Sequence, residues 1–553
     1  MANRNINPVK VSAEYEAGVS FNKGVNLYDT VQTNENFYIG KQWEGVKANG
    51  LPTPVFNFLK RVVQFSVANV STDNLKLRAH PMLCTRDIPT TMLEVYCEIL
   101  NNQFDAIFEQ NKVGGLVREF CRNAAVDGDG CLFTYWDNSV ETGQPSKGAI
   151  KTEILQNTQV MFGNPNSRDV QSQPYILVER RMLVEEAKEY AREHGASKDD
   201  IDAIVADNKE DGNVEIDELG GEKVTVILRM WRDKTTNTIH CYECTRAAEV
   251  REEWDIGIEP YPLVWMCWDY VQDSYHGQAM LTGLIPNQIF VNKLFAMSMI
   301  SLMTLAYPKV VYDKTKISKW SAKVGAAIGV NGGVDGVAKI IDPASISPQI
   351  SQFIDVAISY TQKFLGATDV ALGDARPDNT SAIIALQRAA ATPMELTRQN
   401  LLQCLEQQGD IYKAFEAEYY GNRFVEVKDP NYGKLVVMFD FSTLKLIPAG
   451  IDLEAGASAY WSEIANMQTL DNLLMQGKIP TSEYLRRLPN GYITDKESLI
   501  SITEAAEKGQ MLEVGVQNDA GAGAPQGFAA LRGGPGYGAL QRKINQTGEV
   551  PRK

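Results

Sequence analysis

Apolar and polar positions in the first third of the chain predict helices. Apolar residues recur at helical spacing from about Asn57, over about 90–110 and over about 113–125. The Gly/Pro stretch "NGLPTP" separates the first of these from a shorter helix before it, because glycine and proline interrupt regular elements. Residues 1–25 are mostly polar, and we expect them to form an arm.

The pattern then changes to β-branched and aromatic runs between turn residues, as in strands. These runs are "GCLFTYWD" (130–137), "AIKTEILQ" (149–156), "PYILVERRML" (174–183), and later "KVTVILRMW", "TIHCYECTR" and "YPLVWMCW". Between the two groups, residues from Val184 to about Ala206 have helical spacing interrupted by Gly195, which fits one broken helix or two short ones. The sequence therefore predicts a small α/β insertion bracketed by helices.

The most apolar segment, "LFAMSMISLMTLA" (294–306), belongs to a helix that Pro286 is well placed to start. It is shorter than the roughly 18 consecutive apolar residues of a spanning helix. It also follows Asn292 and Lys293. We therefore predict a packed or ring-forming helix and no membrane span.

A very long helix is predicted over 380–420. A strand at 308–313, a glycine-punctuated stretch, a helix ending near Phe364 and the loop 365–379 precede it. Some 40 helical residues extend roughly 60 Å. Pro393 lies inside this pattern, and an internal proline removes a backbone hydrogen bond and bends a helix. We predict a kink at Pro393 and a cap at Gly421.

The end of the chain is predicted to be helical and then irregular. Two strands return near 423–442, and helices follow over 456–510, with Gly477 ending one of them. After about residue 512 the composition is rich in Gly and Ala, as in flexible tails.

Composition indicates a folded protein of several units. The 553 residues are 44% hydrophobic and 22% charged, and the net charge is −15. This charge works against a tight grip on nucleic acid, which depends on Lys and Arg neutralising phosphates, but suits a passage through which DNA slides. Eight scattered cysteines and an N-terminus without a secretory signal suggest a reducing compartment.

Signatures of catalysis are missing from the sequence. It has four histidines and contains no HExxH, GxxxxGK[ST] or GxSxG motif. In "HCYEC", His240, Cys241 and Cys244 lie close together without a second ligand pair. The strand period places the two cysteines on opposite faces, so we interpret them as ordinary thiols rather than as zinc ligands.

Two groups of acidic residues invite a metal hypothesis. "DNKEDGNVEIDE" has calcium-loop spacing at Asp207, Asp211, Glu215 and Glu218, but Lys209 occupies a ligand position, which favours a solvated acidic turn. Asp369, Asp374 and Asp378 flank the loop before the long helix and resemble the carboxylates of a metal-dependent nuclease. Asp378 is equally well placed to stabilise the N-terminus of that helix.

Several segments, taken in order, resemble a portal protein of a tailed bacteriophage, the head-to-tail connector family. They are "FYIGKQWEG" with Trp43, "DGDGCLFTYWD", "YHGQAMLTGLIPNQIFVNKLF" with Gly277, Gln288 and Asn292, "DARPDNTSAIIALQ", and "LDNLLMQGKIPTSEYLRRLPNG". The resemblance covers roughly residues 30–500.

The resemblance implies a mixed α+β, portal-like fold: a helical wing with small sheets, a helical stem, an α/β clip insertion, a long kinked helix and a helical C-terminal crown. The implied parts are an arm (1–25), the first part of the wing (26–182), a stem helix (183–206), the clip (207–280), a second stem helix (281–307), the wing return (308–445) with a tunnel loop (365–379) and the kinked helix (380–420), the crown (446–512) and a tail (513–553).

The resemblance also implies function. Portals are ring oligomers, usually dodecamers, at one capsid vertex of the virion. They are assembled in the host cytoplasm, carry double-stranded DNA during packaging and ejection, and are neither enzymes nor cofactor-dependent. Implied partners are the large terminase, a head-tail adaptor, and the major capsid and scaffolding proteins. The implied channel residues are Lys293 in the stem and Asp369, Asp374, Arg376 and Asp378 in the tunnel loop.

Two alternatives remain open at this stage. One is a self-assembling virion structural or adaptor protein without a DNA channel, which predicts shells or sheets rather than one ring size. The other is a carboxylate-based metal hydrolase, which predicts turnover that depends on Asp369 or Asp374.

Overall fold

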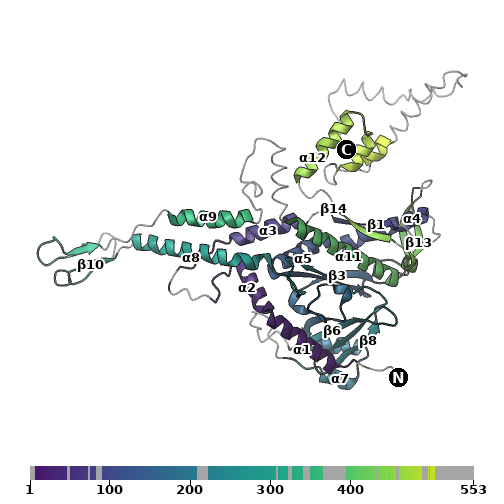
Figure 1. The fold of residues 1–553 in the computed structure, drawn as a ribbon, viewed down its shortest axis with the longest axis horizontal. Helices are drawn as coiled ribbons and strands as arrows, with labels where there is room; N and C mark the ends of the chain where they lie inside the picture. The colour runs from purple at the N-terminus through teal and green to yellow at the C-terminus, as the bar shows by residue number, and fades with distance from the viewer. Residues whose placement is uncertain are drawn as a thin grey trace, which may run out of the picture. The chain divides into compact units, whose positions relative to one another are not determined.

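The computed structural model divides the chain into two compact units, Met1–Ser458 and Ala459–Lys553 (Figure 1). The residues it describes are 6–45, 50, 52–71, 75–82, 90–207, 222–306, 309–321, 327–340, 349–364, 394–429, 433–447, 449–455, 460–488, 493, 496 and 498–504. Of these residues 49% are helical and 22% lie in strands, which form several small antiparallel sheets. The predicted mixed α+β class is confirmed.

The first unit begins with a run of helices. They are α1 (Pro8–Gly24), α2 (Leu27–Ile39), α3 (Phe58–Val70), α4 (Thr90–Gln110) and α5 (Val113–Asp127). Helices α3, α4 and α5 lie where the apolar spacing predicts them. Their apolar stripes meet in one core that contains the fully buried rings of Phe104 and Phe120.

The predicted N-terminal arm is a packed helix. The Asn7 side chain accepts a hydrogen bond from the Lys10 amide at 2.8 Å and caps α1, and Pro8 occupies a favourable first position. Val11 and Tyr15 are buried, and the Tyr15 hydroxyl donates to Glu179 at 2.7 Å. The expectation of an arm was wrong because a narrow buried stripe and polar contacts hold α1, which overall polarity does not register.

The central sheet has five antiparallel strands. In spatial order they are β4 (Val160–Phe162), β5 (Ile176–Leu183), β6 (Lys223–Arg232), β7 (Ile239–Cys244) and β8 (Glu249–Asp255). A second sheet has the order β3 (Ala149–Leu155), β2 (Asp129–Asp137), β9 (Leu263–Cys267). Because β5 pairs directly with β6 and β2 with β9, residues 207–280 are not a separate insertion, and that prediction was wrong.

The segment predicted as a stem helix, 183–206, forms two short helices instead of one rod. They are α6 (Val184–Glu193) and α7 (Lys198–Ala203), separated at Gly195, whose φ of +79° ends the first helix. Ala187 and Ala191 of α6 are buried, and α6 packs against β5, β6 and β8. This helix therefore covers a sheet.

Helices α8 (Met280–Ala306) and α9 (Gln349–Phe364) run side by side (Figure 1). A small antiparallel hairpin of β10 (Val310–Tyr312) and β11 (Ala338–Ile340) lies between them in sequence. Pro286 was predicted to start α8. The helix begins at Met280 and Pro286 lies inside it, so that prediction was wrong.

Helix α11 (Glu395–Tyr419) is the described part of the predicted long helix. Pro393 and the rest of 380–393 lie outside the described residues. The hairpin β12 (Asn422–Asp429) and β13 (Gly433–Asp440) follows as predicted, after Gly421 with a φ of +56°. Strands β1 (Leu75–Pro81) and β14 (Ala449–Ala455) pair beside α11, and Gly409 permits close contact because an added Cβ would lie 2.7 Å from Ile451.

The second unit contains α12 (Tyr460–Met475) and α13 (Thr481–Arg487). Gly477, with a φ of +65°, follows α12 as predicted. Because β14 pairs with β1, the crown boundary predicted at residue 446 is wrong, and the first unit extends to Ser458. The predicted tail, 513–553, lies outside the described residues.

Candidate functional site

Helix α8 has two different halves. Its first half is packed against α2, α3 and α5, with Leu281 and Val291 fully buried. Between residues 290 and 305 of α8, six apolar side chains are 39–58% exposed: Phe290, Met297, Met299, Leu302, Met303 and Leu305. By length and composition α8 is apolar enough to cross a membrane, and most of its apolar stretch is not buried within the chain.

Helix α9 adds to this exposed apolar surface. Phe353, Val356 and Tyr360 are 47–62% exposed. The two helices are joined by a hydrogen bond from the Asn287 amide to the Thr361 hydroxyl at 3.2 Å. So large an apolar surface on a folded chain indicates a contact with another molecule. We call the exposed side chains of α8 and α9 the apolar helix face.

A chain of buried amides anchors α8 in the core. Gln288 and Asn292, one turn apart on α8, are at most 2% exposed. The Gln288 amide donates to Asn292 at 2.9 Å and to the Phe56 carbonyl at 2.8 Å, and Asn292 donates to Gln42 at 2.7 Å. Gln42 in turn donates to the Phe37 carbonyl at 3.2 Å. Because unpaired buried amides are costly, this network fixes the rotation of α8.

Aromatic contacts support the same junction. Phe56 stacks on Phe295 of α8 with ring centres 4.0 Å apart. The Trp43 indole donates to the Pro54 carbonyl at 2.9 Å and holds the incoming loop. The motif residues Trp43, Gln288 and Asn292 thus act together where α8 leaves the core.

Lys293 follows this anchor on α8. Its side chain is exposed, and no ion pair to it occurs in the described part of the chain. It is the one charged residue in the sequence of α8. Other predicted channel residues, Asp369, Asp374, Arg376 and Asp378, lie outside the described residues.

A buried polar cluster joins α1 to strand β2. The Asp129 and His276 side chains are 0% and 4% exposed and are 2.7 Å apart. Asp129 also accepts from the Gly277 amide at 2.7 Å, and the other His276 nitrogen lies 3.0 Å from Asn22. Sequence reasoning missed this pair, because Asp129 and His276 are 147 residues apart.

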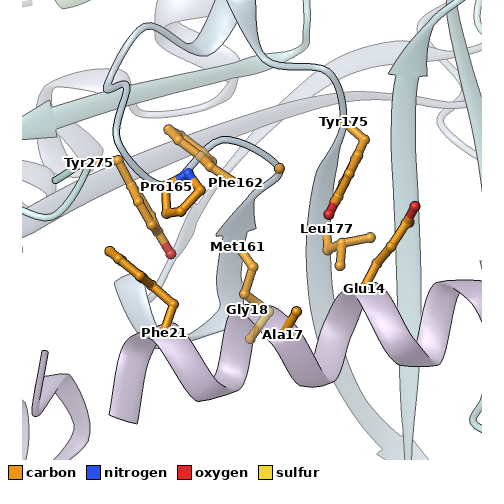
Figure 2. Close-up of a pocket in the computed structure, with 11 residues that line it drawn as sticks. Glu14, Ala17, Gly18, Phe21, Met161, Phe162, Pro165, Tyr175, Leu177 and Tyr275 are labelled. Atoms are coloured by element: carbon orange, nitrogen blue, oxygen red, sulfur yellow. The ribbon is translucent and has the colours of Figure 1, made fainter. Parts of the chain in front are cut away.

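Beside this cluster lies the pocket of Figure 2, between α1 and strands β4 and β5. Phe21 and Tyr275 lie side by side along it, and most of the other lining side chains are apolar. Its one carboxylate, Glu14, is paired with Arg229 at 2.7 Å. The Tyr275 hydroxyl donates to Asn22 at 3.1 Å. These groups are engaged in holding α1, which leaves the pocket without a reactive set.

The metal hypotheses find no support among the described residues, where no group of three His, Cys, Asp or Glu side chains is arranged to hold an ion. The Asp207 carboxylate is paired with Arg181 and accepts from the Thr225 amide at 2.8 Å. Asp211, Glu215 and Glu218 lie outside the described residues. As predicted, Cys241 and Cys244 belong to apolar clusters on different faces of the sheet.

The molecule is therefore built around an exposed apolar helix pair on a packed α+β body, as in proteins that assemble with copies of themselves. The family described as Phage P22-like portal protein matches residues 25–440, about three quarters of the chain. The chain belongs to this family. No curated protein matches it.

Family membership establishes the function at this level. The protein is a structural, non-enzymatic virion component at a capsid vertex, where portal rings serve for DNA packaging and ejection. The portal class predicted from sequence is confirmed, and the hydrolase alternative is not.

Proposed function

We propose that this protein forms a dodecameric ring whose channel is built by the apolar helix pair. Helix α8, over nearly the range 281–307 of the predicted second stem helix, and α9 are the stem. The chain between them, 307–348, is the clip, since it joins the two stem helices. These assignments replace the stem at 183–206 and the clip at 207–280.

The apolar helix face carries this proposal. In an isolated chain, side chains such as Leu302, Met303 and Leu305 are more than half exposed. Copies arranged around an axis place α8 and α9 of one subunit against those of the next and remove these side chains from water. A ring also accounts for the firm anchor at Gln288 and Asn292, because a stem helix must keep one rotation to meet its neighbour.

The remaining parts follow the order of the chain. The bodies of α2–α7, α11 and the sheets are the wing, residues 365–379 are the tunnel loop, Pro393 is the kink of the helix that continues into α11, and the second unit is the crown. Lys293 and the tunnel-loop residues Asp369, Asp374, Arg376 and Asp378 face the channel. Because each chain has a net charge of −15, the channel wall repels the DNA phosphates overall, so DNA moves through the channel without binding tightly.

The ring docks other proteins at its two ends. The large terminase and, after packaging, a head-tail adaptor bind at the clip. Major capsid and scaffolding proteins surround the wing. This part rests on the portal family and on the exposure of most residues of 309–321 and 327–339.

Symmetry of the purified particle tests the proposal. Negative-stain images and mass photometry of the full-length protein are expected to give closed dodecameric rings with a central hole. Monomers at all concentrations, or sheets and solid shells, would refute it, and the latter would favour a shell or adaptor protein without a channel. Co-sedimentation with the large terminase tests the docking end. Wild-type rings are expected to bind terminase, and rings of a variant that lacks 309–340 are expected not to bind it.

A further inference from the structure

The chain carries a concentration of lysines between α8 and α9. Residues 309–321 and 327–340 contain Lys309, Lys314, Lys316, Lys319 and Lys339 against Asp313 and Asp335, a net charge of +3 in a chain whose total is −15. We call these residues the lysine hairpin. The rest of the chain therefore has a net charge of −18.

The lysine hairpin has an ordered core of its own. Strands β10 and β11 pair, the Asp313 amide donates to the Val337 carbonyl at 2.9 Å, and Asn331 donates to the Lys316 carbonyl at 2.9 Å. Ile317 and Val337 are buried, and Tyr312 stacks on Trp320 with ring centres 5.4 Å apart. Ile317 and Val337 thus form a small buried core, Val311 and Val334 are 57% and 77% exposed, and the lysines are displayed on a defined scaffold.

These lysines are not neutralised within the described chain. Four of the five are exposed: Lys309, Lys314, Lys319 and Lys339. No ion pair joins any of the five to a described residue. The Asp313 carboxylate accepts from the Thr315 amide and hydroxyl at 2.9 and 2.6 Å and so closes the turn. By contrast, Arg122 and Arg229 in the body are each paired with a carboxylate.

The exposed lysines of this surface suit phosphates better than they suit the centre of a protein interface. Protein interfaces are depleted in lysine at their centre and depend on exposed aromatic anchors, whereas Tyr312 and Trp320 pack on each other. Phosphate contacts are made by Lys, by Ser and Thr hydroxyls and by backbone amides. Beside the lysines the hairpin has the exposed Ser318 and the glycine-rich stretch "GVNGGVDG", whereas the Thr315 hydroxyl already donates to Asp313.

We infer that the lysine hairpin binds the phosphate backbone of double-stranded DNA at the end of the channel. This rests on the proposed ring, in which Lys309 lies within about 11 Å of the end of α8, since it is three Cα–Cα steps along the chain from Ala306. Repeated in every subunit, the hairpin forms a basic collar on an acidic body. The collar adds a contact that the predicted candidates Lys293 and Arg376 do not include.

Salt-dependent DNA binding by the full-length protein tests the inference. Four neutralised phosphates give an affinity that falls about 100-fold between about 50 and 200 mM salt. The variant K309Q/K314Q/K316Q/K319Q is expected to lose at least about tenfold in affinity for a fluorescent duplex at the lower salt, and to show a flatter salt dependence. The control K10Q/K23Q/K198Q/K234Q removes four exposed lysines elsewhere and is expected to bind like the wild type.

The outcomes separate this inference from the proposed function. Rings of the quadruple variant that bind DNA as tightly as wild-type rings would overturn the inference and leave the ring intact; terminase binding lost in the same variant would then assign the lysines to an acidic protein surface. Equal losses in the variant and in the control would also overturn it, because they indicate a general charge effect. Failure of the wild type to form rings is a failure of the proposed function.

Discussion

Replacing two methionines of the apolar helix face should dissolve the ring without unfolding the subunit. Met297 and Met303 are 50% and 58% exposed on α8. Glutamine has nearly the same length and helix propensity as methionine, so M297Q/M303Q changes little in an isolated chain. Any large effect must then come from a surface that another subunit covers.

The expected magnitude follows from these exposures. Complete burial of a methionine contributes about 1.5–3 kcal/mol, so covering its exposed half contributes about 1 kcal/mol. Burying a glutamine amide without a hydrogen-bond partner costs a further ~1–3 kcal/mol. Two substitutions therefore weaken each subunit contact by at least about 4 kcal/mol, which is at least roughly 1,000-fold in association constant.

Mass photometry over a dilution series measures this effect, with circular dichroism and urea unfolding to check the subunit. The matched control is M82Q/M92Q, whose methionines are 52% and 47% exposed but lie outside α8 and α9. The control should assemble like the wild type. If M297Q/M303Q rings persist to the same dilution as wild-type rings, the apolar helix face is not the subunit contact.

Three further predictions concern the subunit itself. Asn292→Ala removes both hydrogen bonds that Asn292 makes in the chain of buried amides and should lower the free energy of unfolding in urea by about 2–4 kcal/mol. Ser298→Ala removes a hydroxyl that donates to the Leu294 carbonyl within α8 and should change this free energy by less than about 0.5 kcal/mol. Gly277→Ala places a Cβ 2.6 Å from Cys267 and should cost about 3 kcal/mol, whereas Gly283→Ala in open space on α8 should be neutral or stabilising; equal effects would contradict the packing argument. Burial and nearby Glu35 raise the pKa of Asp127 from 3.8 to about 7. The folded state therefore binds more protons than the unfolded state, and this group's contribution to stability falls as pH rises from about 4 to 7. Asp127→Asn should raise the urea midpoint at about pH 8 and leave it unchanged near pH 4, and a gain of equal size at both pH values would contradict the assignment.

Sequence patterns located most regular elements because the relevant signals are local. The apolar stripes of α3, α4 and α5, the strand pairs β12 and β13, and the glycines after α11 and α12 all lie where spacing and turn chemistry place them. The ordered motifs also identified the family, since they are read along the chain.

The errors arose where a long-range contact decides the outcome. Residues 183–206 have helical spacing, but nothing in that spacing says whether the helix covers a sheet or forms a stem. Pairing of β5 with β6 decides this, and it joins strands separated by the acidic stretch. The arm was missed for the same reason, because its buried residues are few and its partners, Glu179 and Arg229, are more than 160 residues away.

The sequence by itself determined the class of protein, the positions of most helices and strands, and the excess of negative charge, all of which depend on residue identity and short-range spacing. Only the tertiary structure decided which helices pair, which apolar side chains stay exposed on α8 and α9, and which amides hold α8 in place. Those properties depend on contacts between residues far apart in the chain, such as Gln42 and Asn292, and burial is a property of the folded surface rather than of any residue alone.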